Sequence, residues 1–268
     1  MKSLLTAILL VTLGFAQADA PPTSQAIPVD QENARRAKAL IDQAIAALGG
    51  QAYLGIQDLS QEGRTYSFYH GRPSSYGVQF WLFYKYPDKE RDELTKQRDV
   101  AYVTNGDQGY EITYKGTRAM EPKDLADSVR RRHFALDRIL REWVNQPGVA
   151  LFYDGTAVAA EKPAEQVTIL NAQNQGVTLD FDSTTHLPLK KSFTWRDPTD
   201  KERNTEEEIY DNYRPVQGVM TPFSITRFYN GDMSNQRFLN SVSYNKGLSE
   251  SLFDARVTYD SRQPLPRK

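Results

Sequence analysis

The side chains best suited to acid–base or metal chemistry are scattered along this 268-residue chain. His70, His133 and His186 fall in a predicted loop, helix and turn, and no two of them have metal-ligand spacing. The chain contains no zinc-protease, nucleophile-elbow, phosphate-loop or dinucleotide-binding motif. Asp180 and Asp182 alternate on the polar face of a predicted strand, although a carboxylate pair that only the fold assembles stays open. We therefore expect a protein that is not an enzyme and needs no cofactor or metal.

A second chemical feature is the run Arg130, Arg131 and Arg132 on a predicted amphipathic helix. A basic helix of this kind can contact anionic lipid or an acidic partner protein, or its charges can simply be solvated. The whole chain has 33 basic and 34 acidic residues, so its charge gives no reason to expect nucleic-acid binding. We keep the three arginines as candidate partner-binding residues.

The N-terminal residues predict export. Lys2 precedes an apolar stretch from Leu4 to Phe15, which is too short to span a bilayer. Ala16-Gln17-Ala18 then forms a small-x-small cleavage site, with Ala18-Asp19-Ala20 as a second candidate and an uncleaved membrane anchor as the alternative. We predict a signal peptide over residues 1–18 and export by the general secretory route.

The exported part is predicted to be an extended leader over residues 19–30 and a single domain over residues 31–268. The chain has no cysteine, so core packing alone must stabilise this domain. Thiol catalysis and cysteine-ligated metals are excluded for the same reason. A chain of this length can form such a core as one β-rich domain.

The elements that must position these side chains are mainly strands. Between Glu206 and Tyr244, apolar residues keep largely to alternate positions in three runs. The turn sequences Arg214–Gly218 and Asn230–Asp232 separate the runs, which predicts an antiparallel meander. The run from Tyr76 to Tyr86 is apolar on both faces, as expected of a strand that is covered twice or lines a cavity.

Only two helices are predicted, over roughly Gln31–Leu48 and Pro122–Asn145. The apolar face of the first is mostly alanine, which suits either a plain packing helix or a weakly docked, movable lid. The second combines a continuous apolar stripe with the arginines described above. We count about eleven strands, most of them with one apolar and one polar face, and two helices cannot cover so large a sheet. The sequence thus predicts an α+β, mainly antiparallel β fold: a half-open, strongly curved barrel with two helices lidding its concave apolar face.

Five segments, in this order and spacing, resemble the bacterial outer-membrane lipoprotein-sorting proteins of the periplasmic lipoprotein-carrier superfamily. They are residues 84–89 (YKYPDK), 103–112 (VTNGDQGYEI), 179–188 (LDFDSTTHLP), 210–223 (YDNYRPVQGVMTPF) and 242–253 (VSYNKGLSESLF). The resemblance implies an incomplete eleven-stranded antiparallel barrel with helices lidding an apolar cavity. It also implies a periplasmic carrier that binds the acyl chains of a lipid or lipoprotein for transfer toward the outer membrane.

The resemblance further implies which residues line the cavity and form the lid. The lipid-binding set is Tyr66, Phe68, Phe80, Leu82, Tyr84, Phe181, Phe193, Phe223 and Ile225. The lid set is Ile41, Ile45, Leu136, Leu140 and Trp143. The implied partners are a lipid or acylated lipoprotein and handover proteins of the inner and outer membranes.

The chain departs from the characterised carriers at one position. Those carriers have an arginine immediately before the strand-ending proline, where it latches the lid, whereas this chain has Tyr86. A second hypothesis fits the same fold and is motivated by the arginine-rich helix: a non-catalytic envelope sensor or regulatory module that binds a protein.

Overall fold

The structure of this protein is a computed structural model that describes residues 29–259. The predicted signal peptide and residues 19–28 of the predicted leader lie outside this range. Residues 29 and 30 already belong to the first helix, which begins two residues earlier than the sequence predicted. Within residues 29–259, no helix combines the length and apolar character that a membrane crossing requires.

One antiparallel sheet of fourteen strands organises the described residues. Its strand order is β7-β6-β5-β4-β3-β1-β14-β13-β12-β11-β10-β9-β8, and β2 pairs with β1 outside this path. The strands are β1 (Asp58–Tyr69), β2 (Arg72–Pro73), β3 (Val78–Lys85), β4 (Lys89–Leu94), β5 (Val100–Asn105), β6 (Gln108–Thr113), β7 (Gly116–Ala119), β8 (Ala150–Ala159), β9 (Lys162–Leu170), β10 (Gly176–Asp182), β11 (Pro188–Arg196), β12 (Arg203–Val216), β13 (Val219–Tyr229) and β14 (Asp232–Tyr244).

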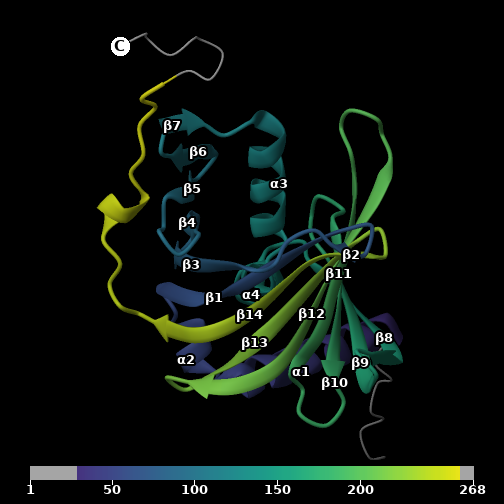
Figure 1. The fold of residues 1–268 in the computed structure, drawn as a ribbon. Helices are drawn as coiled ribbons and strands as arrows, with labels where there is room; N and C mark the ends of the chain where they lie inside the picture. The colour runs from purple at the N-terminus through teal and green to yellow at the C-terminus, as the bar shows by residue number, and fades with distance from the viewer. Residues whose placement is uncertain (1–28, 260–268) are drawn as a thin grey trace, which may run out of the picture.

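The sheet is strongly curved and does not close, so β7 and β8 are its two edges (Figure 1). At its centre the first strand, β1, pairs with the last strand, β14. This arrangement confirms the predicted half-open, mainly antiparallel barrel. The count of about eleven strands was low, in part because β2 and β7 span only two and four residues.

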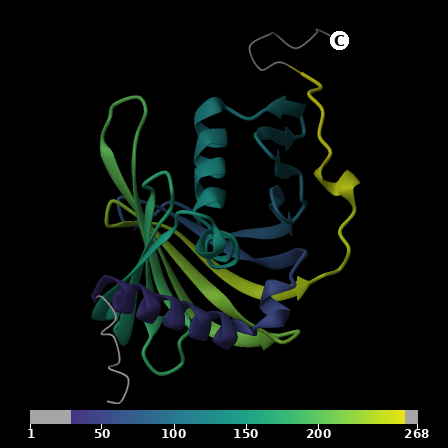
Figure 2. The same cartoon turned by 180° about the vertical axis from the view of Figure 1, so that it is seen from behind.

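α1, α3 and α4 gather on the concave side of the sheet, whereas the C-terminal η2 lies on the opposite side of the wing that contains β4 and β5 (Figure 2). α1 (Val29–Leu48) crosses the wing that β8 to β13 form, and the short α2 (Gln51–Leu54) follows it. α3 (Pro122–His133) stands beside β4 to β7. The remaining helical segments are α4 (Leu136–Arg141), η1 (Trp143–Asn145) and η2 (Glu250–Phe253).

The single helix predicted over residues 122–145 is wrong, because the chain breaks after His133. Ala135 is extended (φ −65°, ψ 139°), and the ring of Phe134 is buried in a parallel stack on Phe193, with 4.1 Å between centroids. The ammonium of Lys191 donates a hydrogen bond to the carbonyl oxygen of Phe134 (2.7 Å). Burial of Phe134 against the sheet therefore overrides a local sequence that has no proline or glycine at the break.

Candidate binding cavity

A cavity of about 630 Å³ lies between the concave face of the sheet and the helices. This volume falls within the range of small-molecule binding sites in proteins. Its wall changes character along β13, where the inward-facing positions run from Val219 through Phe223 and Ile225 to Arg227. The cavity therefore has an apolar end and a charged end.

The apolar end lies where α2, α4, the start of β1 and the β12–β13 turn come together. Aliphatic and tyrosine side chains provide most of its surface. They are Leu48, Tyr53, Ile56, Leu59, Leu82, Tyr84, Tyr86, Leu136, Tyr213, Val219, Met220, Pro222, Ile225 and Tyr244. Burial raises the pKa of Tyr53 and Tyr213 well above the usual value, so these phenols stay neutral. This part of the wall can accept a hydrocarbon chain.

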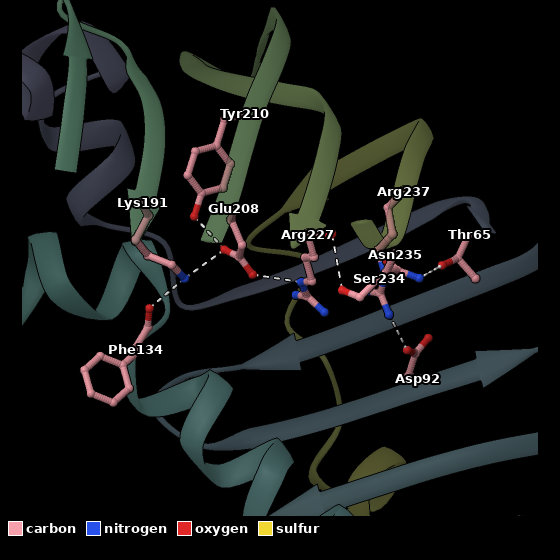
Figure 3. A network of polar contacts seen from close by, with 10 residues as sticks. All are labelled: Thr65, Asp92, Phe134, Lys191, Glu208, Tyr210, Arg227, Ser234, Asn235 and Arg237. Atoms are coloured by element: carbon pink, nitrogen blue, oxygen red, sulfur yellow. Dashed lines mark hydrogen bonds and ion pairs between the residues drawn. The ribbon is translucent and has the colours of Figure 1, made fainter. Parts of the chain in front are cut away.

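The charged end is built around the carboxylate of Glu208 on β12, whose side chain is 15% exposed (Figure 3). Its Oε2 accepts hydrogen bonds from Lys191 Nζ (2.8 Å) and the Tyr210 hydroxyl (2.6 Å), and its Oε1 accepts one from Arg227 Nε (2.8 Å). Burial alone would raise the pKa of Glu208, but the charges of Lys191 and Arg227 and these hydrogen bonds hold it well below its usual value. Glu208 is therefore ionised.

A second ion pair extends the charged end toward β4 (Figure 3). Arg237 Nη2 donates to Asp92 Oδ2 at 2.8 Å, and the Arg237 guanidinium lies over the Phe80 ring, 4.8 Å from its centroid. Arg237 Nε and Asp92 Oδ1 are buried and have no hydrogen-bond partner within residues 29–259. Burial and the nearby Asp92 raise the pKa of Glu90, and the charges of Arg237, Arg227 and Arg131 only partly oppose this shift. Glu90 is thus shifted toward its neutral form.

A smaller recess of about 330 Å³ adjoins the charged end and shares several of its lining residues. The shared residues are Asp127, Arg131, Glu208, Arg227 and Arg237. Phe193 belongs to this smaller recess. The two recesses together make the interior more polar than the apolar cavity that the sequence predicted.

Three of the nine predicted lipid-binding residues line the main cavity, namely Leu82, Tyr84 and Ile225. The aromatic rings of Phe80, Phe181, Phe193 and Phe223 are packed in the main core beneath it, each at most 6% exposed. Phe80, Phe181 and Phe223 therefore support the wall of the main cavity, and Phe193 contributes to the smaller recess instead.

The prediction that Tyr66 and Phe68 line the cavity is wrong, because the structure places both residues on the convex face of the sheet. On β1, Gly63 pairs with the inward-facing Phe80, so positions 63 and 65 face inward and positions 66 and 68 face outward. The Tyr66 ring packs edge-on against Phe238, which is 41% exposed. The sequence showed which residues shared a face of β1 but not which face the barrel encloses.

The predicted lid residues belong to the interior of the half-barrel. Leu136 on α4 lines the cavity, and Ile41, Leu140 and Trp143 are at most 1% exposed. Ile45 is half-buried and packs against the same core. α1, α4 and η1 therefore pack against the core of the half-barrel, and movement of these helices as a lid stays a prediction.

The three candidate partner-binding arginines do not form a continuous basic surface. Arg130 pairs with Asp127 (2.8 Å) and Glu206 (2.8 Å) and lies 3.5 Å from the Trp195 ring centroid. Arg132 is 8% exposed and donates to the Asp88 carbonyl oxygen (3.0 Å) and the Thr104 hydroxyl (3.1 Å). Both side chains anchor α3 through these contacts. Arg130 also lines the smaller recess and Arg132 the main cavity, whereas Arg131 lines both.

Tyr86 connects the end of the aromatic β3 region to α4. Its hydroxyl donates a hydrogen bond to the Asp137 carboxylate, and the Arg141 guanidinium lies 4.0 Å from the centre of its ring. Arg141 Nη2 in turn donates to the Ile56 carbonyl oxygen at 2.7 Å. Burial and the charge of Asp137 raise the pKa of Tyr86 well above its usual value, so the phenol remains a donor. The contact thus occupies the place where the resembling carriers have an arginine latch.

Replacing Tyr86 by phenylalanine should loosen α4 and leave the sheet intact. The variant removes a hydrogen bond to a carboxylate, a contribution of about 1.5–3 kcal/mol, but keeps the ring beneath Arg141. Hydrogen exchange should become at least about tenfold faster at the amides of residues 136–141. Tyr114→Phe, at an 87% exposed tyrosine, is the control. Equal protection of α4 in both variants would show that the contact does not hold the helix.

Sequence analysis missed the charged end of the cavity. Lys191, Glu208, Arg227 and Arg237 lie on strands that it described only by their apolar alternation. One available signal was the phase of Arg227, which continues the inward-facing series of Val219, Phe223 and Ile225. A charged residue in the buried phase of a strand needs a partner, and the sequence does not say which one.

Three solved structures share the architecture of this chain. A DUF1329 family protein from Desulfovibrio piger has a TM-score of 0.54 at 12% identity, over 81% of this chain and 97% of its own. A LolA superfamily protein from Nitrosomonas europaea has 0.50 at 10% identity, over 81% and 97%. A putative outer membrane lipoprotein-sorting protein domain from Vibrio parahaemolyticus has 0.51 at 10% identity, over 83% and 97%.

This chain therefore shares the fold of LolA superfamily, lipoprotein-sorting and DUF1329 proteins. The resemblance inferred from the five sequence segments is confirmed in its fold. No protein-family model and no curated protein matches the sequence. At these identities the likeness establishes architecture, and what the cavity binds has to be argued from its own residues.

Proposed function

We propose that this protein is a non-catalytic periplasmic carrier that binds the acyl chains of a lipid or lipoprotein in its cavity, for transfer toward the outer membrane. The observation that carries this proposal is the cavity of about 630 Å³ with an aliphatic and tyrosine-lined end. The shared fold of proteins described as lipoprotein-sorting supports it. Handover proteins in the inner and outer membranes would load and unload such a carrier.

Hydrocarbon burial supplies the affinity in this proposal. Each buried methylene contributes about 0.8 kcal/mol, so a chain with eight methylenes inside the wall gains about 6 kcal/mol before the cost of ordering it. Leu82, Tyr84 and Ile225 would contact the chain directly. The buried phenylalanines beneath them keep the wall in place.

Native mass spectrometry of protein purified without detergent tests the proposal. We expect adducts with the masses of acyl lipids, released by organic solvent in about equimolar amount. The emptied protein should then bind the neutral apolar dye N-phenyl-1-naphthylamine. Protein that carries no acyl lipid, and after extraction takes up neither the dye nor a monoacylglycerol, would contradict acyl-chain binding.

The contacts of α3 weaken the case for a regulatory protein-binding module. That hypothesis depended on Arg130, Arg131 and Arg132 acting as one basic surface, and two of the three are held by intramolecular contacts. No other described feature favours it, so the carrier is the one function we propose.

A further inference from the structure

Two arginines at the charged end of the cavity have unused hydrogen-bond donors. Arg131 on α3 makes no side-chain hydrogen bond or ion pair within residues 29–259, although it lines both recesses. Arg227 on β13 gives only its Nε to Glu208, and its two terminal amino groups make no hydrogen bond to any described residue. The Arg227 side chain is 32% exposed, so these donors are accessible from the cavity.

The two arginines line the same recesses, and the charge of Arg227 acts on Arg131. Each lines both the cavity of about 630 Å³ and the recess of about 330 Å³. Desolvation by surrounding protein atoms lowers the pKa of Arg131, and the positive charge of Arg227 lowers it further, whereas Glu206, Asp127 and Glu90 oppose the shift. The residue as a whole remains exposed to solvent. An anion bound between two like charges relieves the repulsion between them.

The carboxylates near this position are engaged or shifted toward the neutral form. Glu208 is held by Lys191 and Arg227, and Asp92 by Arg237. Burial and Asp92 raise the pKa of Glu90, the remaining acid of β4 at this end.

The acids contributed by neighbouring elements also have partners or lie farther along α3. Asp127 and Glu206 pair with Arg130, and Glu207 pairs with Lys190. Asp124 lies two helical turns from Arg131, which is about 10 Å along the axis. No carboxylate in residues 29–259 forms a hydrogen bond or ion pair with Arg131, although Glu206, Asp127 and Glu90 attract its charge.

We propose that the charged end of the cavity is a headgroup site that selects amphiphiles with an acidic, oxyanion-bearing head, held between Arg131 and Arg227. The inference rests on the proposed acyl-chain carrier and names the substrate class of that carrier. The chain lies along Leu82 and Ile225, and the head reaches the donors beyond Ile225. Guanidinium groups suit this task because they bind phosphate and carboxylate oxygens with paired donors.

Ligands with the same acyl chain and different heads test this inference. Dissociation constants are measured by displacement of N-phenyl-1-naphthylamine with lysophosphatidic acid, lysophosphatidylcholine and monoacylglycerol, and by titration with inorganic phosphate alone. We expect the lysophosphatidic acid to bind at least about tenfold more tightly than the monoacylglycerol. Inorganic phosphate should neither displace the dye nor compete at millimolar concentration, because the chain supplies most of the affinity.

Arg131→Gln is the deciding variant, because it removes a positive charge that forms no ion pair with any other described residue. The affinity ratio between lysophosphatidic acid and monoacylglycerol should fall about tenfold in this variant. Lys123→Gln, which removes an exposed positive charge from the same helix, is the matched control and should keep the wild-type ratio. Arg227→Gln should also lower the ratio, and circular dichroism would report any accompanying loss of fold.

The outcomes separate this inference from the carrier proposal. Equal affinity for all three heads, or an unchanged ratio in Arg131→Gln, overturns the headgroup site and leaves acyl-chain binding standing. Failure of the monoacylglycerol itself to bind contradicts the carrier proposal. Tight binding of inorganic phosphate alone would identify a general anion site that does not require an acyl chain, and this result would also overturn the inference.

Discussion

Lys191→Met is expected to lower the free energy of unfolding by about 3–5 kcal/mol. The Lys191 side chain is 1% exposed and donates to both the Glu208 carboxylate and the Phe134 carbonyl oxygen. Removing the ammonium leaves a buried carboxylate with one cation fewer and a carbonyl group at the end of α3 without its donor. Urea unfolding followed by circular dichroism measures the difference.

The neighbouring residue on the same strand is a matched control. Lys190 pairs with Glu207 at a site where the two side chains are 29% and 25% exposed. Lys190→Met should therefore cost less than about 1 kcal/mol, as is usual for ion pairs in contact with water. Similar losses in both variants would mean that the buried cluster around Glu208 contributes no more to stability than a surface pair.

The same cluster predicts how stability depends on pH. The folded-state pKa of Glu208 is depressed, so its contribution is fully present above the unfolded value of about 4.5 and is lost as pH falls below it. Glu90 acts in the opposite direction, because its raised folded-state pKa means that ionising it costs stability at higher pH. Glu208→Gln should flatten the loss of stability below pH 4.5. An acid limb as steep as in the wild type would contradict this assignment.

The strands were predictable because their residues follow a period of two. Val177, Leu179 and Phe181 alternate with polar residues, and all three are at most 1% exposed in the structure. This periodicity reports that one face is buried, and long runs of it imply a sheet that curves over its own apolar side. On a strand such as β1, with aromatic residues on its outer face, the period alone does not decide which side is enclosed.

The candidate site was less predictable because tertiary pairing creates it. Glu208 is one of three consecutive glutamates, and only the fold gives it Lys191, Tyr210 and Arg227 as partners. The three consecutive arginines suggested one basic surface, but the fold separates their contacts. Arg130 pairs with the Glu206 carboxylate and Arg132 donates to the Asp88 carbonyl oxygen, and both partners are distant in sequence. Sequence spacing shows which charges are neighbours along the chain, whereas the direction of each side chain depends on the elements packed against it.

Ile225→Trp is expected to reduce acyl-chain binding by about tenfold to a hundredfold. Ile225 lies on the inner face of β13, between the apolar end of the cavity and Arg227, so an indole at this position occupies space that the chain would use. Displacing two or three methylenes at about 0.8 kcal/mol each corresponds to this loss. The dissociation constant of a monoacylglycerol, measured by displacement of N-phenyl-1-naphthylamine, gives the result directly.

Val158→Trp on the edge strand β8 introduces the same indole at a side chain that is 79% exposed, and it should bind the monoacylglycerol as the wild type does.

A second variant tests where the bound acyl chain lies within the cavity. Leu82→Trp narrows the cavity at β3, which is separated from β13 by the central strands β1 and β14. It should reduce binding to a similar degree if one acyl chain passes between Leu82 and Ile225. If Leu82→Trp loses binding and Ile225→Trp does not, the bound acyl chain does not reach β13 and lies apart from Arg227. Full binding in each of the two variants would show that hydrocarbon does not enter this cavity, because the indole added in each variant takes up space in the wall.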